Sequence, residues 1–222
     1  MKRLILKKLV IISQKNEEAR TIEFDDRLTV ITGDNPSGET KNRTGKSLVM
    51  KSIYYSLGAK LKKYTTNWDS LQISTIVTFL YDGIKYELYR DRNSFILRSD
   101  DEVKFFASIS ELKKFYVDFF EFYLKMPIKR DDENSVYAYP GAIFMPFYID
   151  QDKGWSGSWD SFSDVFTGKW KPEILLYHMG VRTREYYNLL DEKVELENEQ
   201  KENKRQLSLI HISEPTRLAL IS

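Results

Sequence analysis

The sequence contains no cysteine, only two histidines and no long apolar run. A disulfide framework and a thiolate metal site are therefore excluded. The histidines, His178 and His211, lie far apart and have no metal-ligand spacing around them. No stretch approaches the ~20 apolar residues that cross a bilayer. The apolar beginning of the chain is interrupted by Lys7 and Lys8, and no small-residue cleavage site follows it. We therefore expect a cytoplasmic protein with no membrane partner.

An excess of charge of one sign is also missing. The 34 basic and 33 acidic residues give a formal charge of +1, so composition offers no electrostatic argument for a nucleic-acid partner. Apolar residues make up 41% and aromatic residues 14% of the 222 residues, which is enough for a buried core. The chain is expected to form one large domain, or one domain with an extension.

Hydrophobic patterning predicts a mixed α/β order of elements in the first half. Apolar and β-branched residues predict strands at residues 4–12, 21–24 and 28–32, followed by a loop and a helix that ends at Gly58. Between residues 74 and 106 the period falls to two, with turn signals such as Asp82-Gly83, which predicts an antiparallel meander. Ser108 and Glu111 form a capping box that opens a helix. Its aromatic stripe is expected to pack in the core: Leu112, Phe115, Tyr116, Phe119 and Tyr123.

The second half becomes helical. An apolar run at residues 142–150 is expected to be a strand, and a helical segment after Pro172 ends at Gly180. A charged, glycine-free helix follows to about Gln206, and a seven-residue recurrence through Leu189 and Leu196 indicates a coiled coil or a long solvated helix. The last stretch is apolar, contains a proline and resembles a translated sequencing adapter. We expect three parts: a lobe at 1–171, a helical arm at 172–206 and a non-native tail at 207–222, the alternative for the tail being a genuine amphipathic segment.

Gly45-Lys46-Ser47 lies between the expected strand at 28–32 and an amphipathic helix. This context predicts a phosphate cradle, the alternative being a surface turn with an incidental lysine. The strict motif, G-x-x-x-x-G-K-S/T, would need a glycine at position 40, where Thr40 stands. If Gly33 opens the loop instead, the cradle is seven residues longer than that motif. ATP with Mg²⁺ is the expected ligand, because Lys46 can bridge phosphate oxygens and the Ser47 hydroxyl can bind the metal. The other residues expected at the nucleotide are Gly33, Asn35, Thr44, Gly45 and Leu48.

The order of these features resembles the N-terminal half of an ATPase head of the SMC/SbcC type. The resemblance runs over residues 1–206 and is carried by LTVITGDN…TGKS near the start, a helix ending in SLGA, the meander, a lone glutamine after an apolar run and an emerging coiled coil. It implies a P-loop NTPase half-domain of ABC type that serves DNA repair, chromosome maintenance or phage defence. The signature segment and the Walker B carboxylates of that family do not occur here.

Within that resemblance, Gln151 is similar to the Q-loop glutamine, which binds magnesium and positions water together with the catalytic Lys46. A rival interpretation makes residues 144–150 a Walker B strand, with Asp150 as the metal-shell carboxylate of a self-contained kinase or GTPase. Pro146 inside the run and Gln151 in place of a catalytic glutamate disfavour the rival. A non-catalytic coiled-coil scaffold with a degenerate loop is the remaining alternative.

The resemblance also implies partners. They are the chain's own C-terminal half, a second head in a homodimer, DNA and a nuclease subunit. The general base would come from the C-terminal half. We therefore expect this chain to bind ATP and to hydrolyse it hardly at all.

Overall fold

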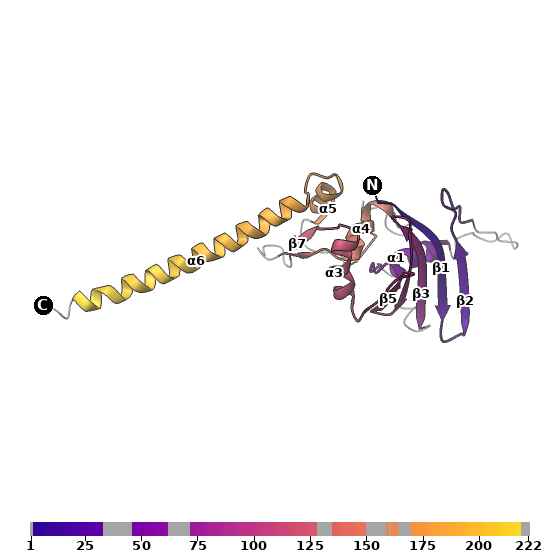
Figure 1. The fold of residues 1–222 in the computed structure, drawn as a ribbon, viewed down its shortest axis with the longest axis horizontal. Helices are drawn as coiled ribbons and strands as arrows, with labels where there is room; N and C mark the ends of the chain where they lie inside the picture. Colours follow the sequence, from indigo (N-terminus) through magenta and orange to yellow (C-terminus); the bar gives the residue numbers. More distant parts are fainter. Residues whose placement is uncertain are drawn as a thin grey trace.

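The computed structural model describes residues 2–32, 46–61, 72–127, 135–149, 159, 161–163 and 170–218. Figure 1 shows an antiparallel sheet with short helices on one face, and a single long helix that extends away from this head to the C-terminus. The described residues thus form a head and a helical arm. The boundaries at 1–171, 172–206 and 207–222 stay a prediction.

The head is built on one antiparallel sheet of order β2-β1-β3-β4-β5-β6 within the described residues. Its strands are β1 (Leu4–Ser13), β2 (Glu18–Glu23), β3 (Ile73–Tyr81), β4 (Ile84–Asp91), β5 (Ser94–Arg98) and β6 (Val103–Phe106). The meander from β3 to β6 confirms the prediction. Its first turn has Asp82 at φ 52° and Gly83 at φ 81°, the left-handed pair that a two-residue hairpin turn requires.

One face of the sheet forms the core. A row of directly opposed residues, Leu9, Val77, Leu88 and Leu97, crosses four strands and is almost completely buried. Helix α1 (Lys46–Ser56) packs against β1, β3 and β4, and α3 (Ile109–Phe119) packs against β5 and β6. Burial of this alternating apolar face is what fixes the register of the strands.

The capping box at the start of α3 is confirmed for Ser108, whereas Glu111 bonds the residue before the N-cap. The Ser108 hydroxyl accepts a hydrogen bond from the Glu111 N–H at 3.3 Å, and the Glu111 carboxylate accepts one from the Ala107 N–H at 2.9 Å. The stripe packs in the core as expected at Leu112, Phe115, Tyr116 and Phe119. The prediction is wrong for Tyr123, which lies beyond the end of α3 and outside the core cluster.

The prediction of a strand at residues 28–32 is wrong for this structure. The segment pairs with no strand among the described residues, and Leu28 and Val30 are 74% and 71% exposed. A strand exists only through its hydrogen-bonded neighbour. The β-branched sequence therefore has the propensity for a strand but no partner here.

The prediction of a strand at residues 142–150 is also wrong. The run forms α4 (Pro140–Phe144) and a 3₁₀ turn, η2 (Met145–Phe147), before it becomes extended at Tyr148. Pro140 lies in the first turn of α4, where its fixed φ favours a helix and its missing N–H costs nothing. The Walker B strand of the rival interpretation is therefore not formed, and Asp150 lies outside the described residues.

A small hairpin and two helices complete the chain. The hairpin pairs β7 (Lys125–Pro127) with β8 (Ser135–Tyr137). Helix α5 (Trp170–His178) ends before Gly180, which has φ 73°, as predicted. Helix α6 (Arg184–Leu218) forms the arm and continues past Gln206, so the predicted helix end is wrong. The non-native origin of the tail and the coiled coil stay predictions, and Leu189 and Leu196 are exposed on the arm.

Candidate functional site

The candidate site lies at the N-terminus of α1, which begins at Lys46. Lys46 is partly exposed, and Ser47 and Leu48 are exposed. The first N–H groups of any helix have no carbonyl partner one turn earlier, and the helix dipole makes this end attractive to anions. An ammonium and a hydroxyl in the first two positions suit a phosphate with a metal ion. The other predicted residues lie outside the described residues: Gly33, Asn35, Thr44, Gly45 and Gln151.

The opposite end of α1 is fixed in the core by Gly58. This residue has φ 93°, and a Cβ built on it would lie 2.8 Å from Cδ2 of Leu112 on α3. The Gly58 N–H donates to the Tyr55 carbonyl at 2.9 Å, and the Ala59 N–H donates to the Tyr54 carbonyl at 3.0 Å. Because the end of α1 approaches α3 so closely, α1 has little room to shift on the sheet.

Arg90, on β4, also holds this end of α1. Its guanidinium donates to the Tyr55 carbonyl and, at 3.4 Å, to the Ala59 carbonyl, and it lies 3.7 Å from the centre of the Tyr55 ring. A cation at a helix C-terminus is favourable for the dipole and adds a charged donor to the carbonyls there. Arg90 is 7% exposed, so this contact is made inside the core.

Tyr54 connects α1 to the segment that precedes Gln151. Its ring lies 4.6 Å from that of Tyr148 and 5.7 Å from that of Phe144, and its hydroxyl donates to the Phe147 carbonyl at 3.1 Å. Burial raises the pKa of Tyr54 to about 12, so this hydroxyl stays protonated as a donor. The structure thus brings the predicted phosphate helix beside the chain leading to the predicted glutamine, although those sequence segments lie about ninety residues apart.

Arg90 and Tyr54 are not among the site residues that the sequence predicts. Arg90 occupies an inward position of the β4 alternation, in phase with the buried Leu88, and a charged residue in such a position is a signal that it has a buried partner. Tyr54 carries no signal in its local sequence, because its contact residues lie about ninety positions away.

Two kinds of site find no support in the described part of the chain. It contains no group of three or more His, Asp or Glu side chains that could hold a metal ion. Its helices include none that is long and apolar enough to cross a membrane. His178 instead packs beside α4, where its Nε2 lies 2.9 Å from the Ala142 carbonyl, and burial lowers its pKa.

No protein-family model matches the chain. Two curated proteins, both named Lamassu protein LmuB, do match it. The chain is similar to LmuB. It is 29% identical to LmuB from Bacillus cereus strain VD014 over 202 residues, which are 89% of this chain and 34% of that protein. It is 32% identical to LmuB from Bacillus sp. strain NIO-1130 over 148 residues, which are 66% of this chain and 24% of that protein. The chain therefore spans about a third or less of the length of these LmuB proteins.

Proposed function

We propose that this chain is the ATP-binding N-terminal lobe of an SMC/SbcC-like ATPase that acts in phage defence. The observation that supports this best is the geometry of α1. Its Lys46-Ser47 end is exposed, its other end is fixed by Gly58 and Arg90, and Tyr54 ties it to the segment before Gln151.

The residues present fit a nucleoside triphosphate with Mg²⁺. Lys46 would neutralise phosphate charge, Ser47 and Gln151 would offer oxygen ligands to the metal, and Leu48 would contribute a backbone N–H of the first helical turn. Gly33, Asn35, Thr44 and Gly45 would complete the loop. The metal would supply charge neutralisation at the phosphates, and Lys46 would add positioning and electrostatic stabilisation.

The exposed segment at residues 28–32 supports a split head. Apolar side chains such as Leu28 and Val30, directly before the proposed cradle, are expected to gain a strand partner and burial when the rest of the head is present. A shallow apolar pocket beside it, lined by Leu6, Ile31 and Met50 among others, would be covered at the same time. We propose that the partner is the protein's own C-terminal half, which would also carry the general base.

The similarity to LmuB favours the defence branch of the SMC-like proteins over repair and chromosome maintenance. Heads of this kind would pair as a homodimer with nucleotide between them, and the arm would continue into a coiled coil. DNA and a nuclease subunit would be the further partners of the whole protein.

The alternatives predict different behaviour. A self-contained kinase or GTPase would need residues 144–150 as a strand ending in Asp150, and the described part of this run is helical up to Phe147. A non-catalytic scaffold would not respond to nucleotide.

Thermal unfolding of the purified chain tests the proposal. With Mg²⁺ and a non-hydrolysable ATP analogue at about 100 times the wild-type Kd, binding should stabilise the native state by about 2.7 kcal/mol. An affinity loss of about 10-fold or more in Lys46→Ala should lower this stabilisation to about 1.4 kcal/mol or less. ATP turnover by the chain should not exceed that of Lys46→Ala. No shift would support the scaffold, whereas turnover that depends on Lys46 would support the self-contained enzyme.

A further inference from the structure

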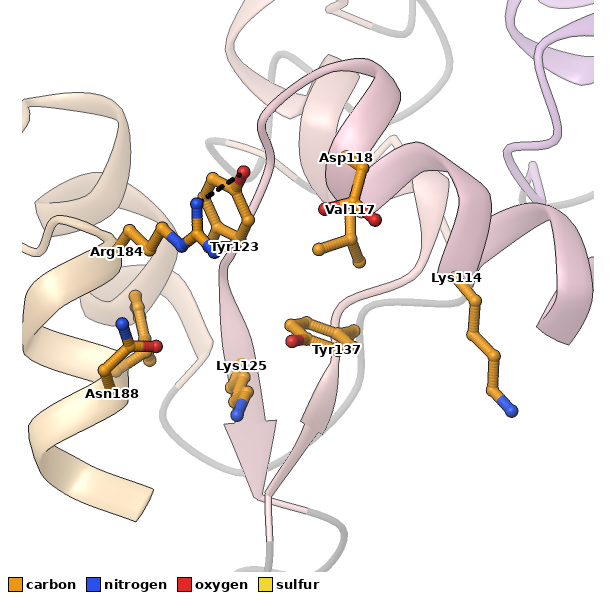
Figure 2. Close-up of a pocket in the computed structure, with 9 residues that line it drawn as sticks. Lys114, Val117, Asp118, Tyr123, Lys125, Tyr137, Arg184 and Asn188 are labelled. Carbon is orange, nitrogen blue, oxygen red and sulfur yellow. Dashed lines mark hydrogen bonds between the residues drawn. The ribbon is translucent and has the colours of Figure 1, made fainter. Parts of the chain in front are cut away.

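A second candidate site lies at the root of the arm. A cavity of about 150 Å³ opens between α3, the β7–β8 hairpin and the first turns of α6 (Figure 2). None of its lining residues belongs to α1 or to the six-stranded sheet, so it is separate from the proposed ATP site. The volume is well above the space that one water molecule needs.

Positive charge predominates in the lining. Lys114, Lys125 and Arg184 stand against the single carboxylate of Asp118, and Lys125 also pairs with Asp191 on the arm. These five side chains carry one net positive charge, and the Lys114 ammonium points away from the other labelled side chains in Figure 2.

The cations are already oriented by tyrosine rings. The Arg184 guanidinium lies 4.5 Å from the centre of the Tyr123 ring and donates to its hydroxyl at 3.4 Å, as Figure 2 shows. Lys125 and Tyr137 are directly opposed across the hairpin, with the ammonium 5.0 Å from the ring centre. The long Tyr123 contact leaves most of the five guanidinium donors available for a planar or tetrahedral anion.

The wall of the cavity also contains Tyr187, which is 2% exposed. Its hydroxyl has no hydrogen-bond partner within the described part of the chain. Burial raises its pKa, so the group remains a proton donor. A buried donor without an acceptor is costly, but this hydroxyl is closed off from solvent, so it is not among the donors to a ligand.

We infer that this cavity binds a phosphate monoester. Arg184 and Lys125 bind the phosphate, the Asn188 amide adds a donor, and the rings of Tyr123 and Tyr137 contact the group that the phosphate esterifies. A bound phosphate would connect α6 to the hairpin and so brace the arm against the head. The same chemistry occurs in a small sugar phosphate and in the 5′-phosphate of a nucleic-acid strand.

Calorimetric titration of the purified chain without Mg²⁺ tests the site, with inorganic phosphate and ribose 5-phosphate as probes. Both should bind, and Arg184→Gln should weaken them by about 10-fold or more, since a charge-assisted hydrogen bond is lost. Lys193→Gln removes the same charge from the exposed side of the same helix. This control should retain affinity within about twofold.

Oligonucleotides with and without a 5′-phosphate distinguish the two sources. Tighter binding of the phosphorylated strand than of ribose 5-phosphate would assign the site to a strand end, and the reverse order would assign it to a free metabolite. Equal binding of the 5′-hydroxyl and phosphorylated strands would exclude a strand end as the source. The inference is overturned if neither phosphate probe binds, or if Arg184→Gln and Lys193→Gln behave alike.

Discussion

Replacement of Gly58 by alanine should loosen the proposed phosphate helix from the core. The left-handed φ of 93° costs an L-residue about 1–2 kcal/mol. The new Cβ would also lie 2.8 Å from Leu112 Cδ2, 3.2 Å from Ile109 Cδ1 and 3.3 Å from Pro140 Cγ. Crowding of this kind costs about 1–3 kcal/mol, so the free energy of unfolding should fall by about 2–5 kcal/mol. For a chain of this size that lowers Tm by about 5–20 °C.

Gly180→Ala is the matched control, because Gly180 has φ 73° and a Cβ added to it would meet no atom within 4 Å. It should lose only the backbone part, about 1–2 kcal/mol. Urea unfolding followed by circular dichroism measures both variants. Equal losses for the two would refute the close approach of α1 to α3, and a loss below about 1 kcal/mol for Gly58→Ala would refute the whole estimate.

Three further predictions concern single side chains. Ser108→Ala should lower the free energy of unfolding by about 1 kcal/mol, because α3 loses its N-cap. Ser110→Ala, on the exposed side of the same helix, should have no measurable effect. Equal effects of the two variants would contradict the cap. Arg90→Met should cost about 2–4 kcal/mol, since the carbonyls at the end of α1 lose a charged donor, and Arg98→Met on the other face of the sheet should be nearly neutral. Because the pKa of His178 is lowered in the folded state, its contribution is complete above the ordinary pKa of about 6.5 and should be lost as pH falls through the lower folded value. Tm measured from pH 7.5 to 5 should therefore fall more steeply in the wild type than in His178→Gln, and identical slopes would count against this.

The meander and α3 could be predicted from the sequence because their signals are local. Asp82-Gly83 fits the left-handed turn conformation, and Ser108 with Glu111 satisfies the first N–H groups of a helix within a few residues. Gly58 marks the end of α1 for the same reason. Each of these elements agrees with its own sequence whatever surrounds it.

The incorrect predictions concern segments whose structure depends on residues far away in the sequence. Residues 28–32 have strand propensity, but a strand needs a neighbour that the described chain does not provide. The run from Ala142 to Phe147 is apolar all round, so its periodicity cannot separate a buried helix from a buried strand. The contacts with Tyr54 and the position of Pro140 in the first turn favour the helix over the strand. Three of the eight predicted site residues, Lys46, Ser47 and Leu48, could thus be placed on α1, while the relation of α1 to Arg90 and Tyr54 required the three-dimensional structure.

The central claim is that the Lys46-Ser47 end of α1 holds the phosphates of ATP, and calorimetry with Mg²⁺ and a non-hydrolysable ATP analogue tests it most directly. We predict saturable binding by the wild-type chain, a loss of about 10-fold or more in Lys46→Ala, and unchanged affinity in Lys85→Ala, whose lysine is exposed on β4. Absence of heat in the wild type, or equal affinity in Lys46→Ala and Lys85→Ala, would contradict the account.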